Sequence, residues 1–427
     1  MTTRRITLAG YGTRGDVQPF VALAWALRQR GHATRLLVPR NLLGWAARAG
    51  VPCSELPVDT QRLLRAEAGQ RMLARGDIHA FFAWLAREER AYAGPMRAAL
   101  RAGCQDADLI ITHALLEDRL AAIGAARRVP VLPVYFFPQL ASSALASPFI
   151  STRSWGPLNR LTHSLLATLL WRMSRDEVHT LREELGMPPA ERSFLREVQR
   201  RDLPVLLAYS RHLHEPPADW GAQALVGGAI TMPGALRTAL GEHGLPPDLQ
   251  RWLAEGPPPL YVGLGSMPLL DPMRTWALVG EVCLRLGVRA VVAAGWSQLP
   301  SGPQGALFGL GEVDHSALLP RCRAAMHHGG SGTVHATLGA GLPTLVTSVF
   351  ADQPFWGARV RTLGVGAHLP FARLDAASVE EGLREVLQPD VVRRAGGLGE
   401  RLRRDEGLER AVAWVEQLLA APPRVPA

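Results

Sequence analysis

The chain has 427 residues, of which 47% are hydrophobic and 20% are charged. This length is enough for two domains of ordinary size, and the hydrophobic content excludes a generally disordered chain. The net charge is +9 and all 47 basic residues are arginines, but they do not cluster with aromatic residues, which excludes a nucleic-acid-binding protein. At most, we expect a weak peripheral attraction to an anionic membrane surface.

The four cysteines, Cys53, Cys104, Cys283 and Cys322, form no CxxC pair, which favours a reducing compartment and buried thiols. Cys322 lies near His327, but no second pair of ligands has the spacing of a zinc site, so we expect no metal. The N-terminus leads directly into a strand, and there is no run of about 18 apolar residues. We therefore expect a cytoplasmic protein without a transmembrane segment.

The first predicted strand ends in a glycine-rich turn, Gly10 to Gly15, and a helical pattern over residues 19–29 follows. The turn contains GxGxxG, which is typical of dinucleotide binding, so an NADP-dependent oxidoreductase is one alternative. Arg40 is available for a 2′-phosphate. Against this alternative, no acidic residue closes the strand at 33–38 to hold a ribose, and Asp16 at the helix mouth repels a pyrophosphate.

Strands and helices alternate through the first half of the chain, which predicts a parallel sheet. Apolar runs at 108–113 and 129–137 follow a mainly helical stretch, and a further strand is predicted at 201–210. The segment 141–171 is an apolar loop and helix. Proline-rich sequence then marks a linker, and we place the domain boundary near Glu215.

In the second half, the strand at 260–264 ends in a turn that contains Ser266, and the strand at 289–294 is followed by Trp296. A third strand, at 324–326, ends in histidines, glycines and hydroxyl residues that open a helix. Such a turn leaves unpaired N–H groups at the positive end of the helix dipole, which makes a phosphate site. The residues that we assign to it are His327, Gly329, Gly330, Ser331, Gly332 and Thr333.

The next strand, residues 343–349, delivers Asp352 and Gln353 to its carboxyl end. Ligands of open α/β sheets bind at that end. A carboxylate accepts hydrogen bonds and an amide both donates and accepts them, so this pair suits sugar hydroxyl groups.

Three stretches together carry a resemblance to a known family: residues 327–360, GTRGDVQP at 12–19 and PPLYVGLGSM at 258–267. They resemble the signature of the UDP-glycosyltransferase superfamily, the GT1 glycosyltransferases of the GT-B fold. The branch of sterol glucosyltransferases and bacterial antibiotic glycosyltransferases is the most similar. The resemblance implies an α/β protein with two Rossmann-like domains that face a central cleft.

The same resemblance implies a division of the chain into three parts. We expect an N-terminal acceptor-binding domain at 1–215 and a C-terminal nucleotide-sugar-binding domain at 216–405. The helix and tail at 406–427 are expected to return to the first domain.

The resemblance also implies roles for individual residues. Asp16 takes the proton of the acceptor hydroxyl as general base, although capping a helix is a common role for aspartate and remains open. Ser266 joins the diphosphate contacts, and Val313 and Trp296 lie at the nucleotide base, with core packing as the alternative for Trp296. The residues of the predicted acceptor region are Gly12, Thr13, Arg14, His113, Phe149 and Trp155.

The implied reaction is metal-independent and inverting, without a cofactor beyond the donor. A hexose, either glucose or a deoxy-hexose, moves from a UDP- or dTDP-sugar to a hydroxyl of a lipophilic small molecule, such as a sterol or other terpenoid, a polyketide or a phenolic. The protein is expected to be a monomer or a homodimer. A GT-B epimerase of the nucleotide sugar and a non-catalytic partner of another glycosyltransferase are the further alternatives.

Overall fold

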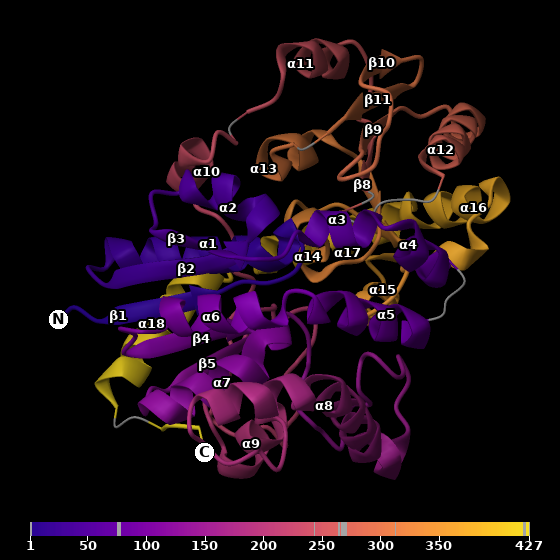
Figure 1. The fold of residues 1–427 in the computed structure, drawn as a ribbon. Coiled ribbons are helices and arrows are strands. Elements are labelled where there is room, and N and C mark those ends of the chain that lie inside the picture. The colour runs from indigo at the N-terminus through magenta and orange to yellow at the C-terminus, as the bar shows by residue number, and fades with distance from the viewer. Residues whose placement is uncertain are drawn as a thin grey trace.

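The computed structural model describes residues 2–74, 78–242, 244–263, 265, 271–311, 313–421 and 424–426. Two seven-stranded sheets form the centres of two α/β domains (Figure 1). The N-terminal domain is drawn in indigo to magenta, and the strands of the second sheet are orange. The alternating strand–helix pattern of the sequence therefore gives the two parallel-sheet domains that it predicts.

The first sheet is parallel throughout, in the order β3-β2-β1-β4-β5-β6-β7. Its strands are β1 (Arg5–Ala9), β2 (Ala33–Pro39), β3 (Cys53–Leu56), β4 (Leu109–His113), β5 (Val131–Tyr135), β6 (Val205–Leu207) and β7 (Ala224–Val226). The helices between and after these strands are α1 (Arg14–Gln29), α2 (Arg40–Ala47), α3 (Thr60–Arg65), α4 (Glu67–Ala74), α5 (Ile78–Arg90), α6 (Ala93–Gly103), α7 (Glu117–Arg127), α8 (Asn159–Glu184), α9 (Phe194–Arg201) and α10 (Gly234–Ala239).

The second sheet has the order β10-β11-β9-β8-β12-β13-β14, and only its edge pair β10–β11 is antiparallel. Its strands are β8 (Leu260–Gly263), β9 (Ala290–Ala293), β10 (Gly302–Gln304), β11 (Leu307–Leu310), β12 (Ala324–His327), β13 (Thr344–Val346) and β14 (Gly366–His368). The helices of this half and of the C-terminus are α11 (Pro247–Ala254), α12 (Pro272–Leu286), α13 (His315–Leu318), α14 (Ser331–Gly339), α15 (Gln353–Thr362), α16 (Ala376–Val386), α17 (Pro389–Arg403) and α18 (Gly407–Ala420).

Each sheet has a point where the strand order reverses, between β1 and β4 in the first and between β8 and β12 in the second. Loops that leave neighbouring strands in opposite directions open a crevice at such a point, and ligands of doubly wound folds bind there. Asp16 follows β1 and His113 ends β4. Gly265 follows β8, and the glycine-rich turn follows β12. The topology thus places Asp16, His113 and the glycine-rich turn at the two switch points.

The domain boundary lies later in the chain than Glu215, where we predicted it. β7 pairs with β6 in the first sheet, and Leu236 and Leu240 of the α10 region are buried in the core of the N-terminal domain. The proline-rich passage is a loop between two adjacent strands, because proline interrupts structure within a domain as readily as between domains. The chain first crosses to the second domain between Gly241 and Pro246.

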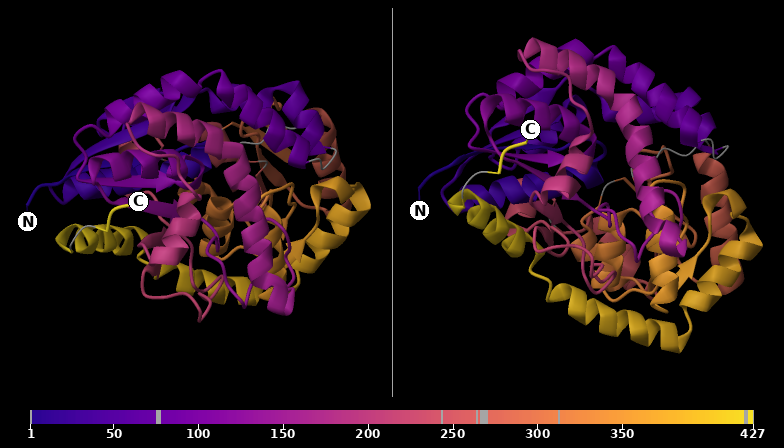
Figure 2. Two further views of the ribbon diagram at one scale, coloured as in Figure 1. Left: turned by 60° about the horizontal axis from the view of Figure 1, so that its bottom comes forward. Right: turned by 90° about the horizontal axis from the view of Figure 1, so that it is seen from below.

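At the C-terminus, α18 returns to the N-terminal domain. Its residues Leu408, Ala411, Val412 and Val415 are buried in the same cluster as the apolar face of α1. Both views in Figure 2 show this helix lying against the indigo part of the chain. The N-terminal domain is therefore completed by the last helix of the polypeptide.

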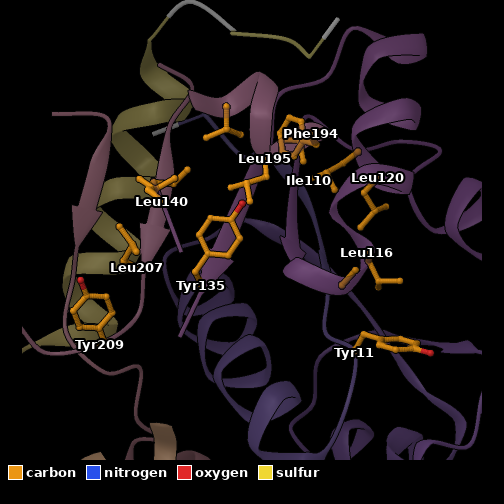
Figure 3. Packing of buried hydrophobic residues seen from close by; sticks show 14 of the residues in the cluster. Tyr11, Ile110, Leu116, Leu120, Tyr135, Leu140, Phe194, Leu195, Leu207 and Tyr209 are labelled. Atoms are coloured by element: carbon orange, nitrogen blue, oxygen red, sulfur yellow. The ribbon is translucent and has the colours of Figure 1, made fainter. Parts of the chain in front are cut away.

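One apolar cluster continues from the first domain into the second. Figure 3 shows part of it in the N-terminal domain, from Tyr11 through Tyr135 to Tyr209. In the second domain it includes Phe355 and Trp356, and Trp356 is the largest fully buried side chain. The rings of Tyr209 and Trp356 meet edge to face across the domain boundary, with centroids 5.8 Å apart. Among the described residues, none of the helices is long and apolar enough to span a membrane.

Candidate active site

The predicted general base, Asp16, lies in the first turn of α1 and closes the turn that follows β1. Its Oδ2 accepts hydrogen bonds from the Thr13 backbone N–H (2.7 Å) and the Thr13 hydroxyl (2.9 Å), which makes a capping box. Gly12 has a φ of 118°, and a Cβ there would collide with this carboxylate. Since Oδ2 is occupied, Oδ1 is the oxygen available to take a proton from an acceptor.

His113, at the end of β4, faces that second oxygen. Its Nε2 lies 3.9 Å from Asp16 Oδ1, and its Nδ1 accepts a hydrogen bond from the Leu115 N–H. Burial lowers the pKa of His113, and the charge of Asp16 opposes this shift. The imidazole is consequently neutral near pH 7, and because Nδ1 accepts, Nε2 carries the proton that points towards Asp16.

The glycine-rich turn at the start of α14 has the shape of an anion site. The helix begins at Ser331, so the N–H groups of its first turn have no partner within the helix. Gly329 has a φ of 90°, and a Cβ at this position would lie 2.5 Å from Val346 Cγ1. Only glycine fits this turn without strain, so the start of α14 depends on Gly329 for its conformation.

The two histidines before the turn point in opposite directions, as successive side chains of a strand do. His327 is buried, its Nδ1 accepts the Gly329 N–H, and its Nε2 meets the Thr337 hydroxyl at 3.2 Å. Both ring nitrogens are occupied within the chain, so His327 braces the turn against α14. We predicted a direct contact between His327 and the diphosphate. That contact stays a prediction, because neither ring nitrogen is free for it in this arrangement.

His328 is the histidine on the crevice side, and the sequence analysis did not assign it a role. It lies between the two glycine turns, since a Cβ at Gly265 or at Gly330 would come within 2.6 Å of its ring. Burial lowers its pKa to about 4, and the charge of Asp16 opposes the shift. The strand alternation at 324–327 was the signal that could have separated the two histidines.

Asp352 and Gln353 follow β13 at the start of α15. The Asp352 Oδ2 accepts a hydrogen bond from Trp356 Nε1 (2.9 Å). Burial, together with the charge of Asp16, raises the pKa of Asp352 to about 7, and the hydrogen bond from Trp356 opposes this shift. The Gln353 Oε1 accepts the Val349 N–H at 2.8 Å, so this oxygen closes the loop and leaves the amide N–H₂ group for a ligand. Contact of either residue with a sugar remains a prediction.

Several other predicted residues contact parts of the protein that limit their roles. Arg14 pairs with Glu242 (2.6 Å) and stacks over Trp45, so its charge is already engaged within the N-terminal domain. Trp296 is buried, and its carbonyl accepts a hydrogen bond from Arg65 of the other domain at 2.7 Å. The burial of Trp296 agrees with core packing, the alternative to a contact with the nucleotide base.

The other residues that we predicted at the base and acceptor sites differ in how far they are exposed to solvent. Val313 is half-buried against the cluster beneath β9 and β11. Phe149 is half-buried and packs against Phe137, with ring centroids 5.1 Å apart, whereas Trp155 is 45% exposed. Ser266 lies outside the described residues. Within the described ranges, no three or more histidine, cysteine, aspartate or glutamate side chains gather closely enough to hold a metal ion.

The arrangement defines a class of protein. Two parallel α/β domains turn their switch points towards one another, with a carboxylate on one side and an N–H-rich turn on the other, and this is the architecture of a GT-B glycosyltransferase. Two family models match the chain: the glycosyltransferase family 28 N-terminal domain over residues 6–93 and the erythromycin biosynthesis protein CIII-like C-terminal domain over residues 296–407.

Relatives place the chain in its family. An uncharacterized glycosyltransferase of Mycobacterium tuberculosis is 32% identical over 93% of this chain and 94% of its own length. The O-mycaminosyltylonolide 6-deoxyallosyltransferase of Streptomyces fradiae is 32% identical over 97% of each chain. A sterol 3-beta-glucosyltransferase of Arabidopsis thaliana is 29% identical over 96% of this chain and 64% of its own length. The chain belongs to this family of glycosyltransferases.

Solved structures agree on the fold. The calicheamicin glycosyltransferase CalG4 has a TM-score of 0.67 and 20% identity, covering 99% of this chain and 100% of that chain. The glycosyltransferase VinC in complex with DTDP has a TM-score of 0.66 and 19% identity, covering 97% and 99%. The membership decides against the oxidoreductase alternative for the turn at residues 10–15.

Replacing Gly329 by alanine is expected to destabilise the protein by about 1–3 kcal/mol, because the new Cβ meets Val346 and the backbone has a positive φ. The turn would shift, so nucleotide affinity should fall as well. Denaturant unfolding and calorimetric titration with a nucleoside diphosphate measure the two effects. Gly332→Ala is the matched control, since a Cβ at Gly332 has open space around it. Equal stability of the two variants would contradict the strained-turn interpretation.

Asp352→Asn is expected to change how stability depends on pH. The folded pKa of Asp352, about 7, lies above its ordinary value of 3.8. Its contribution to stability is therefore present below the ordinary value and is lost as the pH rises through about 7. The variant should gain melting temperature over the parent at about pH 8 but not at about pH 4. If the difference in melting temperature between variant and parent is the same at both pH values, the pKa of Asp352 is not raised by burial.

Proposed function

We propose that this glycosyltransferase is inverting and metal-independent. It moves a hexose, glucose or a deoxy-hexose, from a UDP- or dTDP-sugar to a hydroxyl group of a lipophilic small molecule. The observation that carries the proposal is that Asp16 follows β1 at the switch point of the first sheet while the glycine-rich turn follows β12 at the switch point of the second, and the charge of Asp16 reaches Asp352 and His328, whose pKa values it raises. Proton acceptor and donor site therefore share one crevice.

In the proposed mechanism, Asp16 Oδ1 takes the proton of the acceptor hydroxyl as the oxygen attacks the anomeric carbon. Attack comes from the side of the first domain, and the diphosphate departs towards the second, so the anomeric configuration inverts. A carboxylate is a weak base for an alcohol, and it suffices when proton transfer is late and concerted with cleavage of the glycosidic bond. The neutral His113 beside Oδ1 keeps the carboxylate oriented.

The leaving diphosphate gains charge as the bond breaks. The N–H groups from Ser331 to Thr333, at the positive end of α14, would stabilise that charge without a metal ion. Asp352 and the Gln353 amide would position the sugar hydroxyls. Support for a dTDP-sugar comes from VinC, which was solved with DTDP, and support for lipophilic acceptors comes from the named sterol and tylonolide enzymes.

A transfer assay read by mass spectrometry tests the proposal. UDP-glucose and dTDP-glucose are each combined with sterols, phenolics and macrolides, with EDTA present. A product heavier by one hexosyl unit is the expected result, and the better donor identifies the nucleotide. Dependence on added metal would overturn metal independence. Conversion of the donor to an epimer without an acceptor would instead support the epimerase alternative.

A further inference from the structure

A group of exposed apolar side chains lies along the start of α8. Leu161, Leu165 and Leu169 are 48%, 52% and 42% exposed and follow one another at every fourth position, so they share one face of the helix. Three exposed residues just before the helix extend this surface. The set of Ile150, Trp155, Leu158, Leu161, Leu165 and Leu169 is called the α8 stripe below.

Basic residues outnumber acidic ones around the stripe. From Arg119 to Arg175 the chain contains seven arginines and no acidic residue, although Arg160 pairs with Asp219 (2.7 Å) and Arg175 with Asp176 (3.2 Å). Arg196 of α9 lies against α8, donating to the Thr168 hydroxyl (2.6 Å) and the Ser164 carbonyl (3.3 Å), and no acid pairs with it among the described residues. The stripe is thus an apolar band beside an excess of basic charge, of which Arg196 is the member without an acidic partner.

A cavity of about 480 Å³ lies beside the stripe, between α8 and α9. Arg192, Arg196 and Arg200 line it, and Glu191 is the only acid in its lining. Arg192 pairs with its neighbour Glu191, and Arg200 pairs with Glu197 on the same helix. Arg196, by contrast, binds only neutral groups of α8. The cavity can therefore accept an anionic oxygen without displacing the partner of Arg196.

We propose that the α8 stripe docks on a membrane surface that contains anionic phospholipids. The leucines and Trp155 would enter the boundary between headgroups and acyl chains, as apolar faces of interfacial helices do. The arginines would meet lipid phosphates, which guanidinium groups bind through two donors. This docking does not depend on which sugar or acceptor the enzyme uses.

The charge beside the α8 stripe favours an anionic membrane over a second copy of the chain or a soluble acceptor. In a two-fold symmetric dimer, the stripe of one copy would face the same stripe of the other, and their arginines would repel. A soluble lipophilic acceptor would cover the leucines but leave Arg196, which binds only neutral groups of α8, without a counter-charge. An anionic bilayer satisfies both the apolar band and the basic charge beside it. Figure 2 shows α8 running along the outside of the molecule, where a flat surface can reach it.

Vesicle co-sedimentation of the full chain tests this proposal. We expect binding to vesicles of equal parts phosphatidylcholine and phosphatidylglycerol, weaker binding in high salt, and little binding to phosphatidylcholine alone. The double variant Leu165→Glu, Leu169→Glu should bind at least about tenfold more weakly, and Arg196→Gln should weaken only the binding to anionic vesicles. Leu284→Glu is the matched control, because Leu284 is 78% exposed on α12, away from the stripe.

Three results would overturn the proposal. The first is a chain that fails to bind anionic vesicles, or a double variant that binds them as well as the parent does. The second is a parent that dimerises in sedimentation velocity without lipid while the double variant does not, which would assign the stripe to a second copy. The third is a double variant that binds vesicles normally but has a raised KM for the acceptor, which would make the stripe an acceptor lid. Thermal melting of each variant confirms that it is folded.

Discussion

Asp16→Asn is expected to lower the turnover of sugar transfer by about 10²–10⁴-fold, the range over which general bases act. The amide has no basic oxygen to receive the acceptor proton. Donor affinity, measured by calorimetric titration with the nucleotide sugar, should stay within about twofold of the parent, because the diphosphate site lies on the other domain.

The fold should survive this substitution, since an asparagine oxygen can still accept the Thr13 N–H and cap α1. Asp59→Asn is the matched control: Asp59 caps α3 through a 2.8 Å hydrogen bond from the Arg62 N–H and has no part in the proposed chemistry. The Asp59→Asn variant should keep nearly the turnover of the parent. If the Asp16 variant keeps full turnover as well, the carboxylate is a helix cap and another group takes the proton.

Trp356→Ala is expected to lower the free energy of unfolding by about 3–5 kcal/mol, the usual cost of truncating a buried aromatic side chain. The indole is completely buried among the rings of Tyr209, His335 and Phe355, with centroids 5.0 to 5.8 Å apart. Its loss would leave a cavity where the two domains meet. Denaturant unfolding followed by circular dichroism measures the change.

Two companion variants separate the contributions of Trp356. Trp155→Ala removes a half-exposed indole and should change stability by less than about 0.5 kcal/mol. Trp356→Phe keeps much of the packing but removes the N–H that binds Asp352 at 2.9 Å. It should cost less stability than alanine and still impair turnover. A Trp356→Ala protein as stable as the parent would mean that the shared cluster does not hold the domains together.

The sequence predicted the fold class well because its strongest signals are local. Apolar runs followed by glycine turns and helical patterns predicted both parallel sheets, and the switch points collected Asp16 and the residues at 329–333. The short strand β7 was missed because its three residues follow a proline-rich loop and give no alternation to count. The boundary near Glu215 was wrong for that reason.

The orientation of side chains was harder to predict than their positions. His327 and His328 are neighbours in sequence, and only the direction of β12 decides which one faces the crevice. The contacts of Arg14 with Glu242 and of Trp356 with Tyr209 join residues far apart in the chain. Their pairing depends on how the elements assemble, which no single stretch of sequence encodes.

The return of α18 to the first domain has a consequence for attempts to exchange domains between related enzymes. A single cut between residues 241 and 246 would separate α18 from the apolar face of α1 that it covers. The isolated N-terminal fragment would expose that face and tend to aggregate. A chimera that keeps this acceptor-side domain intact therefore needs two junctions, so that only the part between residue 246 and Asp405 is replaced and α18 stays with its native partner.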